Sequence, residues 1–319
     1  MYLHDIHEKL DQEPIRTGFG RGLLQAGKDD ENVVAACADL TGSTQMAAFA
    51  EEFPNRFVQV GVAEQNLATV GSGLAAMGKI PFVSSYAAFS PGRNWEQIRT
   101  TICLNEQPVK VVGSHAGVSV GPDGATHQML EDIALMRVLP HMVVIAPADS
   151  IEAEKATLAL AKDKKNPGYI RLAREKTPVF TTEKTPFEIG KAYVLSPGKD
   201  LSIITTGTMT YHGLLAAEAL YKDGIDAEVV HVPTIKPLDA ATILTSVEKT
   251  GHVITAEEGQ IAAGFGSAIA ELLAEHHPVK MKRIGMRDRF GESGNPDDLL
   301  EHFGLTAKHI SLAAHDLMA

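Results

Sequence analysis

Glu64 is the first candidate for a catalytic residue in this sequence. It follows an apolar run over residues 57–60 and opens a segment of small residues, so we expect a strand that leads into a helix. A carboxylate at that junction lies at the carboxyl end of a sheet, where open α/β folds keep their ligand crevices. The alternative for Glu64 alone is an acid that only stabilises the helix N-terminus.

The loop from His115 to Gln128, rich in Gly, Ser and Asp, holds the next candidates. Asp123 and His127 lie four residues apart where the loop runs into a predicted helix. Both side chains can therefore reach a bound substrate and take part in proton transfer. His115 at a strand end favours a two-histidine pocket, although an inert surface histidine is the alternative. The spacing of the two histidines matches no short metal-ligand pattern, which argues against a metal site.

Aromatic and basic side chains also follow predicted strands. Tyr86 and Phe89 come directly after a strand, which predicts a flat apolar ring packed there, with ordinary core filling as the alternative. Arg171 and Arg174 follow another strand, and the arginine fork suits phosphate or carboxylate, with surface ion pairing as the alternative. The glycines at 264 and 266 lack the third glycine of a dinucleotide fingerprint, which argues against NAD binding.

The elements that position these residues alternate between strand and helix along the whole chain. This rhythm predicts an α/β protein with two doubly wound, mostly parallel sheets. We expect domains over residues 1–180 and 190–319, joined by a linker over 181–189 in a segment without helical period. Residues 1–31 predict a helical opening, with one apolar face made by Ile15, Phe19, Leu23 and Leu24.

Composition narrows the class of protein. The 319 residues are 44% hydrophobic and 22% charged, as in soluble globular proteins, and no window approaches the roughly 18 apolar residues of a membrane span. The net charge of −11 disfavours nucleic acid as a partner. The start shows no secretion signal, so we expect a cytoplasmic protein. Cys37 and Cys103 predict buried hydrophobes rather than a disulfide.

Four stretches together carry a family resemblance. Residues 61–66 (GVAEQN), 85–89 (SYAAF), 121–128 (GPDGATHQ) and 172–174 (LAR) resemble, in order and spacing, the C-terminal section of a transketolase divided between two polypeptides. The resemblance covers essentially the whole chain. The first domain is similar to the pyrimidine-binding domain and the second to the C-terminal domain of that family.

The resemblance implies thiamine diphosphate as cofactor, with Glu64 and His127 as the catalytic residues. A carboxyl in an enclosed apolar pocket favours its protonated form, so Glu64 would hold a proton on N1′ of the aminopyrimidine. In that family the bound cofactor would supply a nucleophilic carbon for attack on a ketose carbonyl, and a two-carbon unit would pass to an aldehyde. Tyr86, Phe89 and Phe82 would line the aminopyrimidine pocket, with Tyr86 standing where phenylalanine is common.

The resemblance also assigns the substrate. Asp123 is similar to the acidic residue that binds the substrate hydroxyl next to the substrate carbonyl. His127 is similar to the histidine that contacts the substrate hydroxyls. The sugar phosphate would be bound by a set of four residues: Arg16, Ser43, His115 and Arg174. The implied default is xylulose 5-phosphate as donor and ribose 5-phosphate or erythrose 4-phosphate as acceptor, in the pentose phosphate pathway. Modified or sulfonated sugars would need only small changes around the anion-binding residues.

A segment of the family pattern does not occur in this sequence. The family binds the diphosphate and Mg²⁺ (or Ca²⁺) through Gly-Asp-Gly followed by Asn, in a domain that precedes this section, and the chain contains no Gly-Asp-Gly. We therefore expect a partner, the N-terminal transketolase subunit, in an α2β2 assembly with the active site at the shared interface.

Three other functions stay open at this stage. The β chain of a 2-oxo-acid dehydrogenase has a glutamate after a strand but lacks the Asp-Gly-x-Thr-His-Gln loop in this form. Deoxyxylulose phosphate synthase shares more of that loop, although it is normally one longer chain. A non-catalytic scaffold would need none of Glu64, His115, Asp123 and His127, so their joint presence disfavours it.

Overall fold

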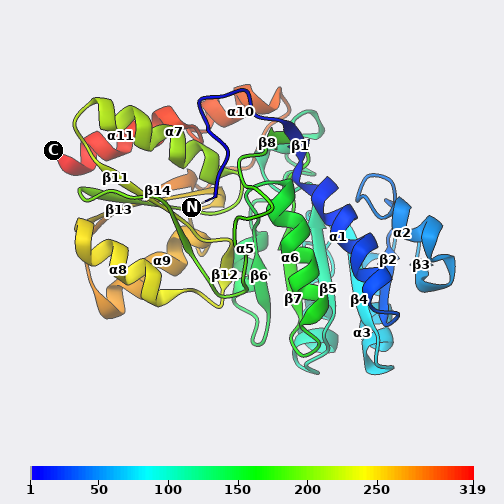
Figure 1. The fold of residues 1–319 in the computed structure, drawn as a ribbon. Helices are drawn as coiled ribbons and strands as arrows, with labels where there is room; N and C mark the ends of the chain where they lie inside the picture. Colours follow the sequence, from blue (N-terminus) through cyan, green and yellow to red (C-terminus); the bar gives the residue numbers. More distant parts are fainter. Residues whose placement is uncertain (1) are drawn as a thin grey trace.

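The computed structural model describes residues 2–319, and the chain folds around two sheets with helices on both faces of each (Figure 1). In the first sheet all pairs are parallel except that of the edge strand β12 with β6. Its order is β12 (Thr234–Lys236), β6 (Val143–Ile145), β7 (Gly168–Arg171), β5 (Lys110–Ser114), β4 (Ile80–Tyr86), β2 (Val33–Cys37) and β3 (Phe57–Gln59).

Alternate strand residues of this sheet face two different cores, which is why its strands are almost wholly apolar. Phe82 and Val112 face the layer of α1 (Ile15–Asp29) and α6 (Ser150–Lys162). Val83 and Val111 face the layer of α3 (Glu64–Ala76). The shorter helical segments around this sheet are α2 (Ala47–Glu52), η1 (Pro54–Arg56), α4 (Trp95–Gln97), η2 (Ile98–Cys103), η3 (Val118–Asp123) and α5 (Asp132–Arg137).

The second sheet is parallel except for its edge strand β9, and it has the order β14 (Lys280–Met286), β13 (His252–Gln260), β10 (Leu201–Thr205), β11 (Ala227–His231) and β9 (Tyr193–Ser196). One face packs on α7 (Met209–Lys222) and α11 (Ala307–Met318), and the other on α8 (Ala240–Thr250) and α9 (Phe265–His276). The helix α10 (Pro296–His302) lies beside η3 of the first half. The predicted α/β class with mostly parallel sheets is confirmed.

One detail of the sequence prediction is wrong. The first helix begins at Ile15 rather than near the start, because Pro14 disfavours helix before it, and residues Gln12–Pro14 instead form β1, paired with β8 (Lys176–Pro178). The strand β12 comes from the second half of the chain yet completes the sheet of the first. One apolar core consequently runs through both halves and includes Ile235 of β12.

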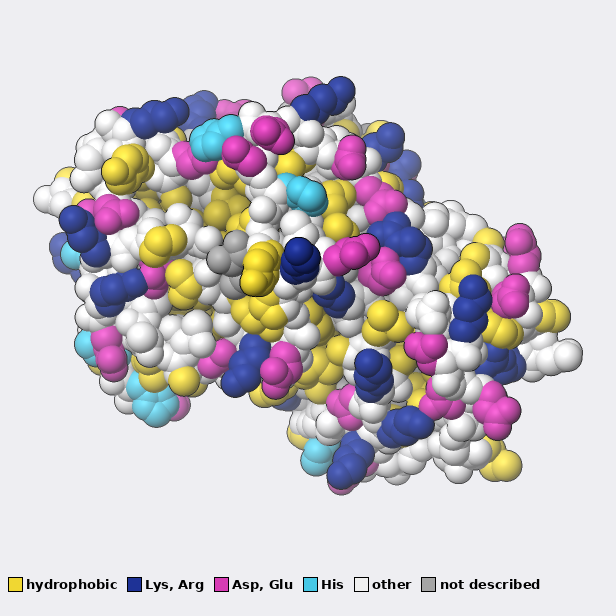
Figure 2. Space-filling model, in the orientation of Figure 1, with side chains coloured by type: hydrophobic (Ala, Val, Ile, Leu, Met, Phe, Trp, Pro, Cys, Tyr) yellow, Lys and Arg dark blue, Asp and Glu magenta, His cyan; other side chains and the backbone are white. Residues whose placement is uncertain are grey.

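The surface mixes charges of both signs. Figure 2 shows Lys and Arg side chains next to Asp and Glu over the visible face, and Arg21, for example, binds both Glu13 and Glu154. Both cysteines are buried, as predicted. Among residues 2–319, no helix is both long and apolar enough to cross a bilayer.

Candidate active site

The carboxyl ends of neighbouring strands bring the candidate residues to one edge of the first sheet. Tyr86 ends β4 and pairs in register with Ser114, the last residue of β5, so His115 follows directly beside Tyr86. The Tyr86 and His115 rings stack with their centroids 3.8 Å apart. Glu64 opens α3 after β3, the edge strand that β2 separates from β4, and a strand leads into a helix at this residue as the sequence predicts.

The Glu64 side chain is buried, with 2% of it exposed. Its Oε2 accepts a hydrogen bond from Nη1 of Arg93 at 2.6 Å, and Asn94 donates from Nδ2 to the Glu64 carbonyl at 2.8 Å. Half of the Arg93 side chain is exposed, and its guanidinium carbon lies 4.9 Å from the centroid of the Phe89 ring. The carboxyl is therefore enclosed, as expected, but its partner is a cation rather than apolar surroundings alone.

Aromatic rings surround the second histidine of this edge. The Tyr86 and Phe89 rings stack with centroids 6.2 Å apart. His127 meets both edge-on, at 6.2 Å from Tyr86 and 5.4 Å from Phe89, and its Nδ1 lies 2.9 Å from Oγ1 of Thr126. The structure thus joins both histidines and both aromatic residues in one cluster, which ordinary core filling does not require.

His115 is held as a neutral ring. Its Nε2 lies 2.8 Å from Nη1 of Arg16 and its Nδ1 lies 2.8 Å from Oγ of Ser114. Because a guanidinium can only donate, Nε2 accepts and Nδ1 carries the proton that is donated to Ser114. Burial, followed by the charges of Arg16 and Arg174, lowers the pKa of His115 to about 3. Its backbone has φ of 58°, a strained conformation of the kind that clusters at functional sites.

Two arginines, Arg16 and Arg174, lie close enough to His115 for their charges to act on it. Burial lowers the pKa of Arg16, and the nearby charge of Arg174 lowers it further. Arg16 donates to the Ser43 carbonyl at 3.3 Å, while its Nε is buried without a partner. Arg174 donates to the Val120 carbonyl at 2.7 Å. Two guanidinium groups this close favour an anion between them, because a phosphate would both pair with them and relieve their repulsion.

Phe82 and Arg171 lie in the buried interior rather than in this cluster, and Asp123 lies on the surface of its loop. Phe82 is fully buried in the core against Phe19, with ring centroids 6.3 Å apart. Asp123 is exposed at the end of η3, next to Gly124 with φ of 73°. Arg171, a possible anion binder from sequence, instead forms a buried pair with Asp132 at 2.9 Å and donates to the Glu258 carbonyl at 2.6 Å.

Sequence reasoning missed Arg93 and Asn94. Both lie in the turn that follows Phe89, and the only signal in the sequence was a cation four residues after an aromatic residue. Asn94 is fully buried and also donates to Oγ of Ser90 at 3.1 Å, so it ties this turn to the start of α3.

Comparisons with known proteins agree with this arrangement. The family description "Transketolase, pyrimidine binding domain" matches residues 12–179, and "Transketolase, C-terminal domain" matches residues 190–310. The 6-deoxy-6-sulfo-D-fructose transketolase subunit SqwH of Clostridium sp. (strain MSTE9) is 43% identical over 97% of this chain and 96% of its own length. A 1-deoxy-D-xylulose-5-phosphate synthase of Desulfotalea psychrophila is 37% identical over 98% of this chain but 49% of its own.

A solved structure named "Split gene transketolase, inactive beta4 tetramer" has the same fold, with a TM-score of 0.90 and 42% sequence identity. The match covers 96% of this chain and 98% of that one. Both halves of the chain and nearly all of its length are therefore accounted for by one family. The chain belongs to the transketolase family, and this membership implies dependence on thiamine diphosphate.

Proposed function

We propose that this chain is the C-terminal catalytic subunit of a transketolase that moves a two-carbon ketol unit from a ketose phosphate to an aldose phosphate. The observation that carries the proposal is the gathering of a buried acid, two histidines, two aromatic rings and an arginine pair at one sheet edge. A scaffold relative would need none of these groups. The proposal keeps the division into residues 1–180, a linker over 181–189 and residues 190–319.

The residues at this edge fit the pyrimidine half of thiamine diphosphate. Glu64 would hold a proton at N1′, while Tyr86 and Phe89 would contact the flat ring, as their stacked arrangement favours. When bound, this cofactor supplies a nucleophilic carbon and an electron sink for cleavage of a C–C bond. Phe82 is left out of this role, since it packs in the core.

The neighbouring side chains fit a phosphorylated sugar. In the proposal, Arg16 and Arg174 hold the phosphate, with Ser43 and the neutral His115 beside them. His127 contacts the hydroxyls near the reacting carbonyl, and Asp123 reaches the adjacent hydroxyl when substrate is bound. Xylulose 5-phosphate with ribose 5-phosphate or erythrose 4-phosphate is the default pair of substrates. A relative named for 6-deoxy-6-sulfo-D-fructose makes a sulfonated sugar the first alternative to test, because a sulfonate also suits two arginines.

The diphosphate would be held elsewhere. We propose that a second subunit binds it with Mg²⁺ (or Ca²⁺) and that two copies of each chain form the active assembly. Three observations support this: the chain contains no Gly-Asp-Gly, a relative is named as a subunit, and a single-chain relative is about twice as long. The neighbour of 42% identity, named as an inactive tetramer of β chains, further suggests that this type of subunit self-associates when alone.

Reconstitution tests the proposal. The chain is mixed with the product of a neighbouring reading frame that contains Gly-Asp-Gly, expected to be about 270 to 300 residues long. Ketol transfer from xylulose 5-phosphate is then measured with thiamine diphosphate and Mg²⁺. Turnover by the pair but not by either chain supports the proposal, and turnover by this chain alone refutes the need for a partner. Parallel assays with pyruvate test the second candidate, deoxyxylulose phosphate synthesis, which the 37% identity to such an enzyme favours.

A further inference from the structure

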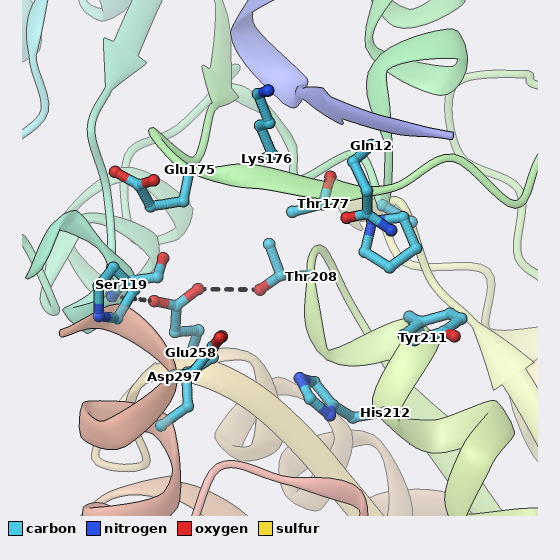
Figure 3. Close-up of a pocket in the computed structure, with 14 residues that line it drawn as sticks. Gln12, Ser119, Glu175, Lys176, Thr177, Thr208, Tyr211, His212, Glu258 and Asp297 are labelled. Atoms are coloured by element: carbon cyan, nitrogen blue, oxygen red, sulfur yellow. Dashed lines mark hydrogen bonds between the residues drawn. The ribbon is translucent and has the colours of Figure 1, made fainter. Parts of the chain in front are cut away.

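A cavity of about 300 Å³ lies between the two halves of the chain on the side of η3 (Figure 3). It is lined by β8, by the start of α7 and by α10, and Glu258 of β13 reaches into it from the second sheet. Figure 3 shows the Glu258 carboxylate between Ser119 and Thr208, joined to both by hydrogen bonds. The second half of the chain thus contacts the loop that carries Asp123 and His127.

Both oxygens of this carboxylate are engaged. Oε1 accepts from the backbone N–H of Ser119 at 2.7 Å, and Oε2 accepts from Oγ1 of Thr208 at 2.9 Å. The Glu258 side chain is 2% exposed, and its own carbonyl accepts from Arg171. A buried carboxylate whose two oxygens both accept hydrogen bonds holds the donor groups in place, because a charged acceptor makes stronger hydrogen bonds than a neutral one.

The loop is shaped to receive this carboxylate. Gly117 has φ of 91°, and a Cβ at this position would lie 2.2 Å from Oε1 of Glu258. Only glycine combines this backbone conformation with so close an approach. Gly117 and Ser119 together make the start of the loop complementary to one acidic side chain from the other half.

The rest of the loop is also held by the second half of the chain. Gln128 donates from Nε2 to the Glu292 carbonyl at 2.8 Å. Ser293 donates from Oγ to the Pro122 carbonyl at 2.6 Å, next to Asp123. Contacts from the second half therefore lie at the beginning, the middle and the end of residues 117–128, although Asp123 itself is exposed.

We propose that Glu258 is a positioning residue that holds residues 117–128 in the conformation in which Asp123 and His127 meet the substrate. The second domain then contributes to substrate binding as well as to assembly. The inference rests on the proposed function for the roles of Asp123 and His127, whereas the support of the loop by Glu258 is a property of this chain alone.

Hydrogen–deuterium exchange of the full chain without partner tests the support directly. Glu258→Ala is expected to raise exchange of the Ser119 amide and its neighbours by about tenfold, because a hydrogen bond to a buried charge is lost. Glu258→Gln keeps an oxygen that accepts from Ser119 and should restore most of the protection. Glu228→Ala is the matched control, because Glu228 is an equally buried carboxylate of the same sheet that pairs with Lys249. Should Glu258→Ala fail to fold, Thr208→Val removes one of the two donors and should give a smaller increase in the same segment.

The reconstituted pair gives the second readout. Glu258→Ala is expected to raise KM for the sugar phosphates by about tenfold while the affinity for thiamine diphosphate stays within about twofold, with recovery in Glu258→Gln. Unchanged exchange over residues 117–128, or an equal rise throughout the second sheet, would overturn the inference. Absence of ketol transfer in the wild-type pair would instead refute the proposed function and leave the exchange result standing.

Discussion

Arg93 donates to Glu64 at 2.6 Å while its guanidinium lies over the ring of Phe89, so one cation occupies two groups that the proposed cofactor site needs. The aminopyrimidine would need Arg93 to move from the Phe89 face. Half of the Arg93 side chain is exposed, but Glu64 is buried, so parting the pair leaves a buried carboxyl without its cation, and cofactor binding must offset that cost.

Arg93→Met is therefore expected to strengthen thiamine diphosphate binding by the reconstituted pair, by at least about twofold, because the cofactor no longer has to displace the guanidinium. Calorimetric titration of wild type and variant measures the change. Arg99→Met, at an exposed arginine of the following helical segment, is the matched control and should leave the affinity as it was. Weaker binding in the Arg93 variant would show that this arginine supports the site rather than competing for it.

Glu64→Gln replaces the buried acid with an amide of the same shape. A side chain that takes part in proton transfer contributes about 10²- to 10⁴-fold, so kcat of the reconstituted pair should fall by at least about a hundredfold. Circular dichroism and thermal unfolding should show that the variant still folds, since Asn94 binds the Glu64 carbonyl rather than its carboxylate. Turnover close to wild type would favour the scaffold alternative.

The sequence predicted where a candidate side chain lies when a strand end fixes its position. Tyr86 and His115 were each predicted at a strand end, and the structure brings them together because the carboxyl ends of parallel strands meet at one edge. Phe82 shows the limit of this reasoning. It shares a face of β4 with Tyr86 but lies four residues earlier, about 13 Å along the strand, so it reaches the core instead of the edge.

Contacts that depend on turns and on packing between the two halves could not be predicted. The partner of Arg93 is set by an irregular turn with no helical or strand period. The hydrogen bond between Ser119 and Glu258 joins residues 139 positions apart, and no local pattern encodes how the halves pack. The same holds for β12, which pairs with β6 some ninety positions earlier in the chain. This separation is close to the length of a small domain.

Arg16 offers a test of the anion site that separates substrate from cofactor. Its Nε is buried without a partner, which a bound phosphate would satisfy. Arg16→Met should raise KM for the sugar phosphates by about ten- to a hundredfold, the loss expected for charge-assisted hydrogen bonds, and leave thiamine diphosphate binding unchanged. Arg21→Met, on the same helix, removes an arginine already paired with Glu13 and Glu154 and serves as the control. Equal effects of both substitutions would contradict a phosphate site at Arg16.

The buried His115 makes the stability of the folded chain depend on pH in a defined window. Its pKa is lowered to about 3 in the folded chain by burial and by the charges of Arg16 and Arg174, whereas in the unfolded chain it returns to about 6.5. Between these values the unfolded chain binds a proton that the folded chain does not. The free energy of unfolding should therefore fall as pH drops from about 6.5 towards 3, with this residue contributing up to about 1.4 kcal/mol per pH unit.

His115→Gln removes the titrating ring but keeps a side chain that can accept from Arg16. Urea unfolding at a series of pH values from about 7 to 4.5 should give a shallower slope for this variant, by close to one proton, with convergence of the slopes above about pH 6.5. Parallel curves for wild type and variant across the whole window would mean that His115 takes up its proton in the folded chain. In that case the assignment of a neutral His115 ring between Ser114 and Arg16 would be wrong. The tautomer assigned to His115, on which the proposed phosphate contact depends, would be wrong as well.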